Sequence, residues 1–85
     1  MSMAATEQAK QQAIDDGLAW LAGTMADTGT EGYWSYSNNG TLAATGSAAL
    51  AFIEEGYLPG SDVVIDSTNY GDVVGKACNY IFNRA

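Results

Sequence analysis

Apolar residues recur at helical spacing in two segments of this chain. In the first, about residues 7–22, one stripe faces a polar side and consists of Ala13, Ile14, Gly17, Leu18, Trp20 and Leu21. The second, from residue 70 to the end, has a stripe of Val73, Val74, Ala77, Cys78 and Ile81. A spacing of three and four residues places such side chains on one face of a helix. The pattern therefore predicts two amphipathic helices, each with one buried face.

A third helix is predicted between them, over about residues 42–55. The segment from Leu42 to Ile53 contains no charged residue and is rich in Ala, Gly and Ser. Such a helix lacks a polar face, so we expect it to be buried on most sides. Because a helical glycine costs about 1 kcal/mol relative to alanine, Gly46 indicates a close helix contact. Glu54 and Glu55 follow at the C-terminal end, where the helix dipole disfavours negative charge, and we interpret them as solvated.

Capping residues bound these three segments. Ser, Thr, Asp and Asn side chains accept hydrogen bonds from the unpaired N–H groups at helix starts, whereas Gly and Pro end helices. With 85 residues the chain has room for one small domain, which we place at residues 6–85 after a tail of residues 1–5. The expected N-caps are Thr6, then Asn39 or Thr41, then Asn69, and the expected stops are Gly23, Gly56 and Pro59.

The loop before the small-residue helix is rich in glycine and aromatic residues. It contains Gly32, Tyr33, Trp34 and Tyr36. We favour a structural clamp, in which Trp34 lies over helix ends while the tyrosines bury their rings and keep their hydroxyls hydrated. The alternative is a ligand-binding cluster, with Tyr33, Trp34 and Tyr36 as the candidate binding residues.

The first and last helical segments also resemble one another. Residues 13–21 align without gaps on residues 73–81, an offset of 60 residues, and the apolar positions coincide. This match predicts a repeat protein that comprises one full unit and the opening helix of the next. Repeat units rarely bury their apolar faces without neighbours, so we expect contacts with further copies or partner chains.

Charge and composition limit the possible chemistry. Ten acidic residues and three basic residues give a net charge of −7, which argues against nucleic acids and anionic membranes as partners. The chain has no histidine and a single cysteine, Cys78, which we interpret as a core residue. A Ser/His or Cys/His nucleophile pair is therefore excluded, as is an internal disulfide. We predict no catalytic residue, no metal ligand and no cofactor.

Two acidic loops are weak candidates for cation sites, and we predict a cation at neither. Residues 27–32 are similar to the start of a calcium-binding loop, but position twelve of that loop would be Asn38 rather than glutamate. Asp62 and Asp66 form a second, equally weak candidate. No signal-peptide pattern and no apolar run long enough to cross a bilayer is present, so we expect a soluble chain of unknown compartment.

The segments AIDDGLAWLAGTM, EGYWSY, LAATGSAALAFIEEGYLPG and YGDVVGKACNYIFNRA together resemble the terpenoid cyclase and protein prenyltransferase repeat, the α/α-toroid. Gly32 and Trp34 match the Gly-x-Trp loop of that family, whereas its glutamine position holds Thr28. The resemblance implies an all-α fold, a partial toroid repeat in which Trp34 stacks on a helix end and the second helix forms an inner wall. The family's Asp-x-Asp-Asp acid motif is absent, and we interpret the Asp15–Asp16 pair as a solvated helix face.

Three functions follow as hypotheses. The leading one is a non-catalytic structural or interaction module that self-associates or binds a partner protein chain. The alternative is a fragment of a terpenoid-cyclase-like enzyme whose acid motif lies elsewhere. The third is a binding module for an isoprenoid-like apolar ligand.

Overall fold

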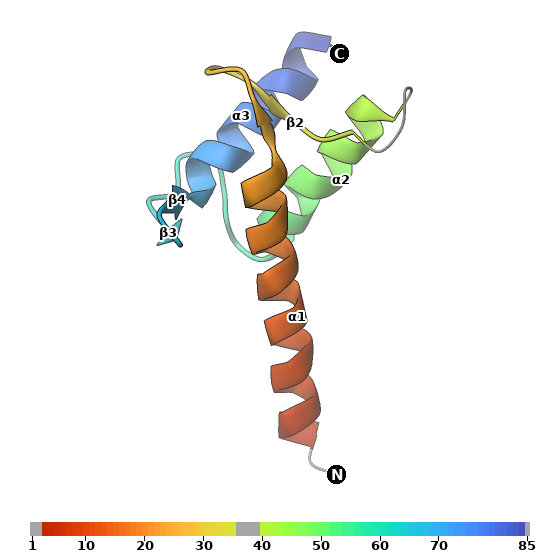
Figure 1. Ribbon diagram of the computed structural model, residues 1–85, viewed down its shortest axis with the longest axis vertical. Coiled ribbons are helices and arrows are strands. Elements are labelled where there is room, and N and C mark those ends of the chain that lie inside the picture. Colours follow the sequence, from red (N-terminus) through yellow and green to blue (C-terminus); the bar gives the residue numbers. More distant parts are fainter. Residues whose placement is uncertain (1–2, 36–39, 85) are drawn as a thin grey trace.

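The chain is mainly α-helical, with two short antiparallel hairpins. The computed structural model describes residues 3–35 and 40–84, with side chains from residue 7 onward. The described part measures 47 × 29 × 19 Å. In chain order its elements are α1 (Met3–Thr24), β1 (Ala26–Asp27), β2 (Gly32–Tyr33), α2 (Thr41–Glu54), β3 (Val64–Ile65), β4 (Thr68–Asn69) and α3 (Tyr70–Arg84) (Figure 1).

The core lies between α2 and α3 and is closed by β2. Phe52 of α2 and Val74 of α3 are completely buried, and the ring of Tyr70 meets that of Phe52 edge to face at 5.2 Å. Burial raises the pKa of Tyr70 above its ordinary value of 10.0. Thr45, Ala49 and Ala77 fill the space between these larger groups. Because the side chains at this contact are small, the two helices pack closely and gain dispersion energy.

Only the C-terminal half of α1 packs on this core. Figure 1 shows the N-terminal half extending away from the other elements. Leu18 is buried and Leu21 partly so, but Ile14 and Trp20 are exposed. The prediction of a fully buried stripe on α1 is therefore wrong. At about 1.5 Å per residue, the 22 residues of α1 span about 33 Å, far more than the 14-residue α2 can cover.

The helix bounds confirm some predicted caps and correct others. α1 already begins at Met3, so Thr6 lies inside the helix and is not its N-cap. It runs through Gly23 to Thr24. The predicted cap of α3 is confirmed, since Asn69 Oδ1 accepts a hydrogen bond of 2.8 Å from the backbone N–H of Asp72.

The start of α2 differs from the prediction. Its N-cap is Gly40, which offers no side chain for capping, and Thr41 is the first helical residue. Asn39, the other predicted cap, lies outside the described residues. The backbone oxygen of Gly40 accepts from the N–H of Ala44 at 2.8 Å, so the first helical bond forms without a side-chain cap.

Both predicted long loops contain a hairpin. β1 pairs with β2 in a register that places Ala26 opposite Tyr33. β3 pairs with β4, with Ile65 opposite Thr68. The two-residue turn of the second hairpin has positive φ at Asp66 (51°) and at Ser67 (67°), the signature of a type I′ turn. That turn normally uses Asn-Gly or Asp-Gly, so Asp-Ser was a weak sequence signal.

α2 is less buried than its sequence predicted. Ala48 lies in the core, but Leu42, Ala43 and Leu50 are exposed on the outer face of the helix. A side chain built at Gly46 would meet no atom within 4 Å, so the close contact expected at Gly46 is absent within this chain. α2 thus presents an uncovered apolar surface.

A close contact occurs instead at Gly71, in the first turn of α3. A Cβ at this position would collide with the backbone N, C and O of Ser61. Because these are backbone atoms, the collision could be relieved only by moving the loop that leads into β3. Gly71 therefore allows this loop to cross the start of α3.

The predicted repeat extends over the aligned helices but not before them. Residues 13–21 and 73–81 are helical in α1 and α3. At the same offset, residues 4–9 belong to α1, whereas residues 64–69 form the β3–β4 hairpin. Val74 is fully buried, while its counterpart Ile14 is 41% exposed. The two helices thus share a pattern but not an environment.

Candidate functional site

Trp34 fastens the loop after β2 to the end of α1. Its side chain is buried, and the indole Nε1–H donates a hydrogen bond of 2.9 Å to the backbone oxygen of Leu21. The backbone of Trp34 is held as well, because its N–H donates to Thr45 Oγ1 at 3.0 Å and its oxygen accepts from the same hydroxyl at 3.3 Å. The indole is tilted against Phe52, with 6.3 Å between the ring centres. This geometry confirms that Trp34 lies over a helix end.

Gly32 and Thr28 shape the β1–β2 hairpin that precedes Trp34. A Cβ at Gly32 would collide with the side chain of Met25, so the glycine lets Met25 lie against the strand. Thr28 occupies the glutamine position of the toroid motif, and its bonds are local. The Thr28 N–H and hydroxyl donate to the backbone oxygen of Glu31 at 2.9 and 3.2 Å. They close the turn between β1 and β2.

Tyr33 faces a different helix from Trp34. Its ring stacks on that of Tyr80 in α3, with 5.1 Å between the centres and 28° between the planes. The guanidinium of Arg84 lies 3.8 Å from the centre of the same Tyr80 ring. Tyr33 and Trp34 therefore contact different helices and do not form one cluster. Tyr36, the third candidate binding residue, lies outside the described residues.

Ion pairs hold the β1–β2 hairpin against α3. Lys76 Nζ lies 2.7 Å from Asp27 Oδ2, and Arg84 lies 3.1 Å from Glu31 Oε2. The hydrogen bond from Lys76 lowers the pKa of Asp27, and the hydrogen bond from Asn83 lowers that of Glu31. Conversely, Asp27 raises the pKa of Lys76. The two carboxylates of the possible calcium loop are thus engaged in holding α3.

An apolar groove runs between α1 and α2, and we call it the α1–α2 groove. It has two parts, of about 490 and about 370 Å³. Trp20, Leu21 and Ala51 border both parts. The first part is further lined by Ile14, Gly17, Leu18, Glu54 and Glu55, and the second by Trp34, Ser35, Ala44, Ser47 and Ala48. In the second part, α2 contributes only small side chains, which form its floor, and Trp20 and Trp34 also line it.

Trp20 is the groove residue that the sequence placed wrongly. The apolar stripe predicts a buried side chain at this position, yet Trp20 is 66% exposed. The available signal was its place at the margin of that stripe, one helical turn after Asp16. A large aromatic side chain that remains exposed beside other apolar groups is typical of a binding surface.

The rim of the groove is acidic at one end. Glu54 is the last residue of α2 and Glu55 is its C-cap. Among the residues that the structure describes, neither carboxylate has a cationic partner, and Glu55 accepts a hydrogen bond of 3.0 Å from Gln11 of α1. Both therefore carry negative charge at the helix end that favours positive charge.

Other candidate chemistry finds less support. Asp15 and Asp16 accept hydrogen bonds from Gln11 and Gln12 on the exposed surface of α1, which confirms the solvated helix face. Cys78 is half-buried and packs against the core, as predicted. No group of three potential metal ligands occurs in the described part of the chain.

Comparison with known proteins identifies no relative. The chain matches no protein-family model, no curated protein and no solved structure. Within residues 3–35 and 40–84, no helix is long and apolar enough to cross a membrane.

Proposed function

We propose that this chain is a non-catalytic interaction module and that the α1–α2 groove binds a polypeptide segment. The exposure of Trp20 beside the small apolar floor of α2 carries this proposal. Contiguous exposed apolar surface with a polar rim marks sites of protein association. Tryptophan is also among the residues that contribute most binding energy at interfaces.

The polypeptide segment we propose for this groove is an amphipathic helix. Its apolar side chains, at three- and four-residue spacing, would lie over Ala44, Ser47, Ala48 and Ala51, where the floor offers little bulk. The floor is flanked by Trp20 and Trp34, which are rigid and lose little conformational entropy on binding. Groove and partner would then bury the surface that the free chain leaves in water.

A small apolar ligand is the second candidate. The part of the groove that borders Trp34 has a volume of about 370 Å³, within the range of about 300–1,000 Å³ that is usual for ligand sites. An isoprenoid-like molecule would suit its lining. We favour a polypeptide because the groove is flanked by only two helices, and a wall that is 66% exposed at Trp20 leaves much of a small ligand in water.

We also propose that the module is a repeat of the α/α-toroid type. Support comes from the Gly32–Tyr33–Trp34 loop, whose tryptophan caps α1, and from the exposed outer face of α2. In such an array, Leu42, Ala43 and Leu50 would contact the neighbouring repeat. The alternative, a piece of a cyclase-like enzyme, would require the acid motif to lie in another part of a longer protein.

Fluorescence of Trp20 tests the polypeptide proposal. Amphipathic helical peptides with basic, neutral and acidic polar faces, and farnesol, would be titrated into the chain. We expect a blue shift of the emission with at least one peptide, and loss of that shift in Ala51→Glu, which places a charge in the groove. The matched control is Ala9→Glu, the same change at an exposed position of α1 that does not line the groove. A response to farnesol alone would favour the small ligand, and no response to any probe would contradict both candidates.

A further inference from the structure

The charge around the α1–α2 groove indicates what kind of segment binds there. We infer that the partner segment is a basic amphipathic helix, with Lys or Arg placed against Glu54 and Glu55. This inference rests on the proposed function, because it assumes that the groove binds a polypeptide. It adds the chemistry of the partner, which groove shape alone leaves open.

The first argument is the unbalanced charge at the end of α2. The last turn of α2, which the structure describes in full, contains no basic residue, and the helix dipole places partial negative charge at this end. Glu54 and Glu55 add two carboxylates at the same point. A cation from a partner would interact favourably with the helix dipole and would reduce the repulsion between the two carboxylates.

The second argument is that, among the residues the structure describes, every basic side chain is already engaged. Its three basic residues are Lys10, Lys76 and Arg84. Each already pairs with a carboxylate elsewhere: Lys10 with Glu7, Lys76 with Asp27 and Asp72, and Arg84 with Glu31. Since these three side chains are paired elsewhere, we expect the positive charge that this rim favours to come from a partner.

The third argument weighs a second copy against a different partner. Each copy carries a net charge of −7, and the polar side of α1 includes Asp15 and Asp16 beside the groove-lining residues. Docking one copy into another would bring like charges together at the rim, which disfavours association. A basic segment gains from the same field, and its association is accelerated by electrostatic attraction.

The dimensions of the groove set the length of the segment. Its lining on α2 extends from Ala44 to Glu55. At about 1.5 Å per residue this is about 16 Å, so a helix of about 12 to 14 residues covers the groove. With apolar residues at i, i+3, i+4 and i+7, one face fits the floor while flanking lysines reach the acidic rim.

The test compares two peptides of about 14 residues with the same leucine face. One carries Lys at the polar positions and its twin carries Glu. We expect the Lys peptide to shift the emission of Trp20 and the Glu peptide to bind at least tenfold more weakly. Binding of the Lys peptide should weaken as salt is raised from about 0.05 to about 0.5 M, because salt screens exposed charges.

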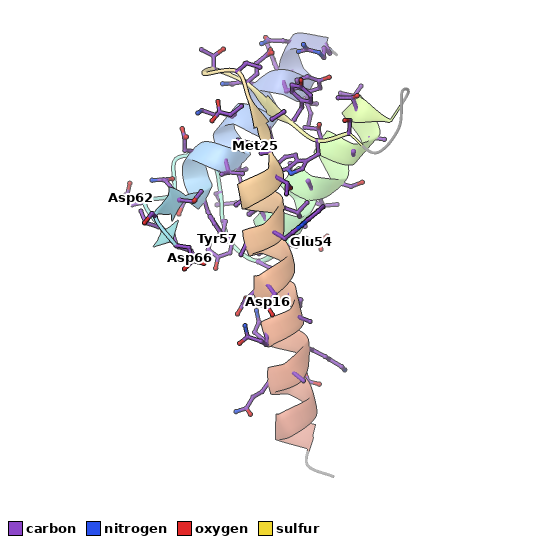
Figure 2. The ribbon with its side chains drawn as sticks, viewed as in Figure 1. Asp16, Met25, Glu54, Tyr57, Asp62 and Asp66 are labelled. Carbon is purple, nitrogen blue, oxygen red and sulfur yellow. The ribbon has the colours of Figure 1, made fainter. Side chains whose placement is uncertain are left out.

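Charge-neutralising variants distinguish attraction to Glu54 and Glu55 from attraction to the negative charge of the whole chain. The double variant Glu54→Gln/Glu55→Gln should weaken the Lys peptide about three- to tenfold, the range expected for two exposed ion pairs. The matched control is Asp62→Asn/Asp66→Asn, which removes the same charge near the β3–β4 hairpin. Figure 2 shows Asp62 and Asp66 well apart from Glu54. Equal weakening by both double variants would show unspecific attraction and overturn the inference.

The remaining outcomes separate the inference from the proposed function. If both peptides bind equally and Ala51→Glu abolishes both, the groove binds helices and the basic partner is wrong. If light scattering shows a dimer that shields Trp20 from quenching by acrylamide, the occupant is a second copy and the inference falls. If no peptide binds and the chain is monomeric, both the proposed function and the inference of a basic partner are wrong.

Discussion

Replacing Trp34 with phenylalanine tests whether this residue is a structural clamp. The change keeps an aromatic ring against Phe52 but removes the indole N–H that donates to the oxygen of Leu21. That oxygen still accepts from the N–H of Met25 at 3.1 Å, so it is not left unsatisfied. The lost bond should therefore contribute only the usual net value of about 1 kcal/mol.

The smaller ring adds a second cost. Trp34 is only 8% exposed, so phenylalanine leaves a void of at least methyl size, worth about 1 kcal/mol. Together the two effects predict a loss of about 2 kcal/mol from the free energy of unfolding. For a domain of this size, each kcal/mol lowers the melting temperature by about 4–8 °C, so the expected shift is about 8–16 °C.

The matched control is Trp20→Phe, the same substitution at a side chain that is 66% exposed. It should change the free energy of unfolding by less than about 0.5 kcal/mol. Thermal melts followed by circular dichroism compare the two variants. Equal melting temperatures for both would refute the structural clamp.

Three further changes probe other parts of the fold. Gly71→Ala should destabilise the chain by more than about 2 kcal/mol in urea unfolding, because the new Cβ collides with backbone atoms of Ser61. The matched control is Gly75→Ala in the same helix, which should stabilise the chain by about 0.5–1 kcal/mol because the space around Gly75 is open. Equal effects would contradict the close contact. Ser67→Gly should raise the free energy of unfolding by about 0.5–1 kcal/mol in the same assay, because glycine adopts the positive φ of this turn without strain; a loss of stability would refute the type I′ assignment. Finally, the hydrogen bond from Lys76 lowers the pKa of Asp27 below its ordinary value of 3.8. The ion pair therefore stabilises the folded chain above that pH, and this stabilisation is lost as the pH falls through the lowered pKa. The wild type should melt above Asp27→Asn at about pH 6 and together with it at about pH 2, and a difference that persists in acid would contradict the ion pair.

The sequence predicted the helices because their periodicity is local information. The end of α2 follows from Gly56, whose φ of 92° ends the helix, and the start of α3 follows from the side chain of Asn69. The position of Trp34 was also accessible, since a glycine beside a tryptophan before a small-residue helix has a recognisable packing purpose. In each case residues close in sequence determine the structure.

The exposure of α1 and α2 was not accessible in the same way. Ile14 and Trp20 lie on a helical stripe, and the stripe specifies a face but not the partner that covers it. Gly46 was misread for the same reason, because its low helix propensity does not reveal whether another helix approaches. Thr45, buried and bonded to both backbone groups of Trp34, depends on a contact across 11 positions. Which of these residues are covered depends on tertiary packing, which local sequence patterns do not specify.

α1 combines two levels of stability in one continuous helix. Leu18 is buried and Leu21 partly so, whereas every residue from 7 to 17 is exposed. An isolated helix of that length is marginal in water, so this half relies on the packed turns to continue it. We expect amide hydrogen exchange to be slow near Leu21 and to become faster toward the N-terminus. Amide hydrogen exchange in this half of α1 should therefore report the binding of a partner. Binding along the groove would extend protection from exchange from Leu18 toward the N-terminus.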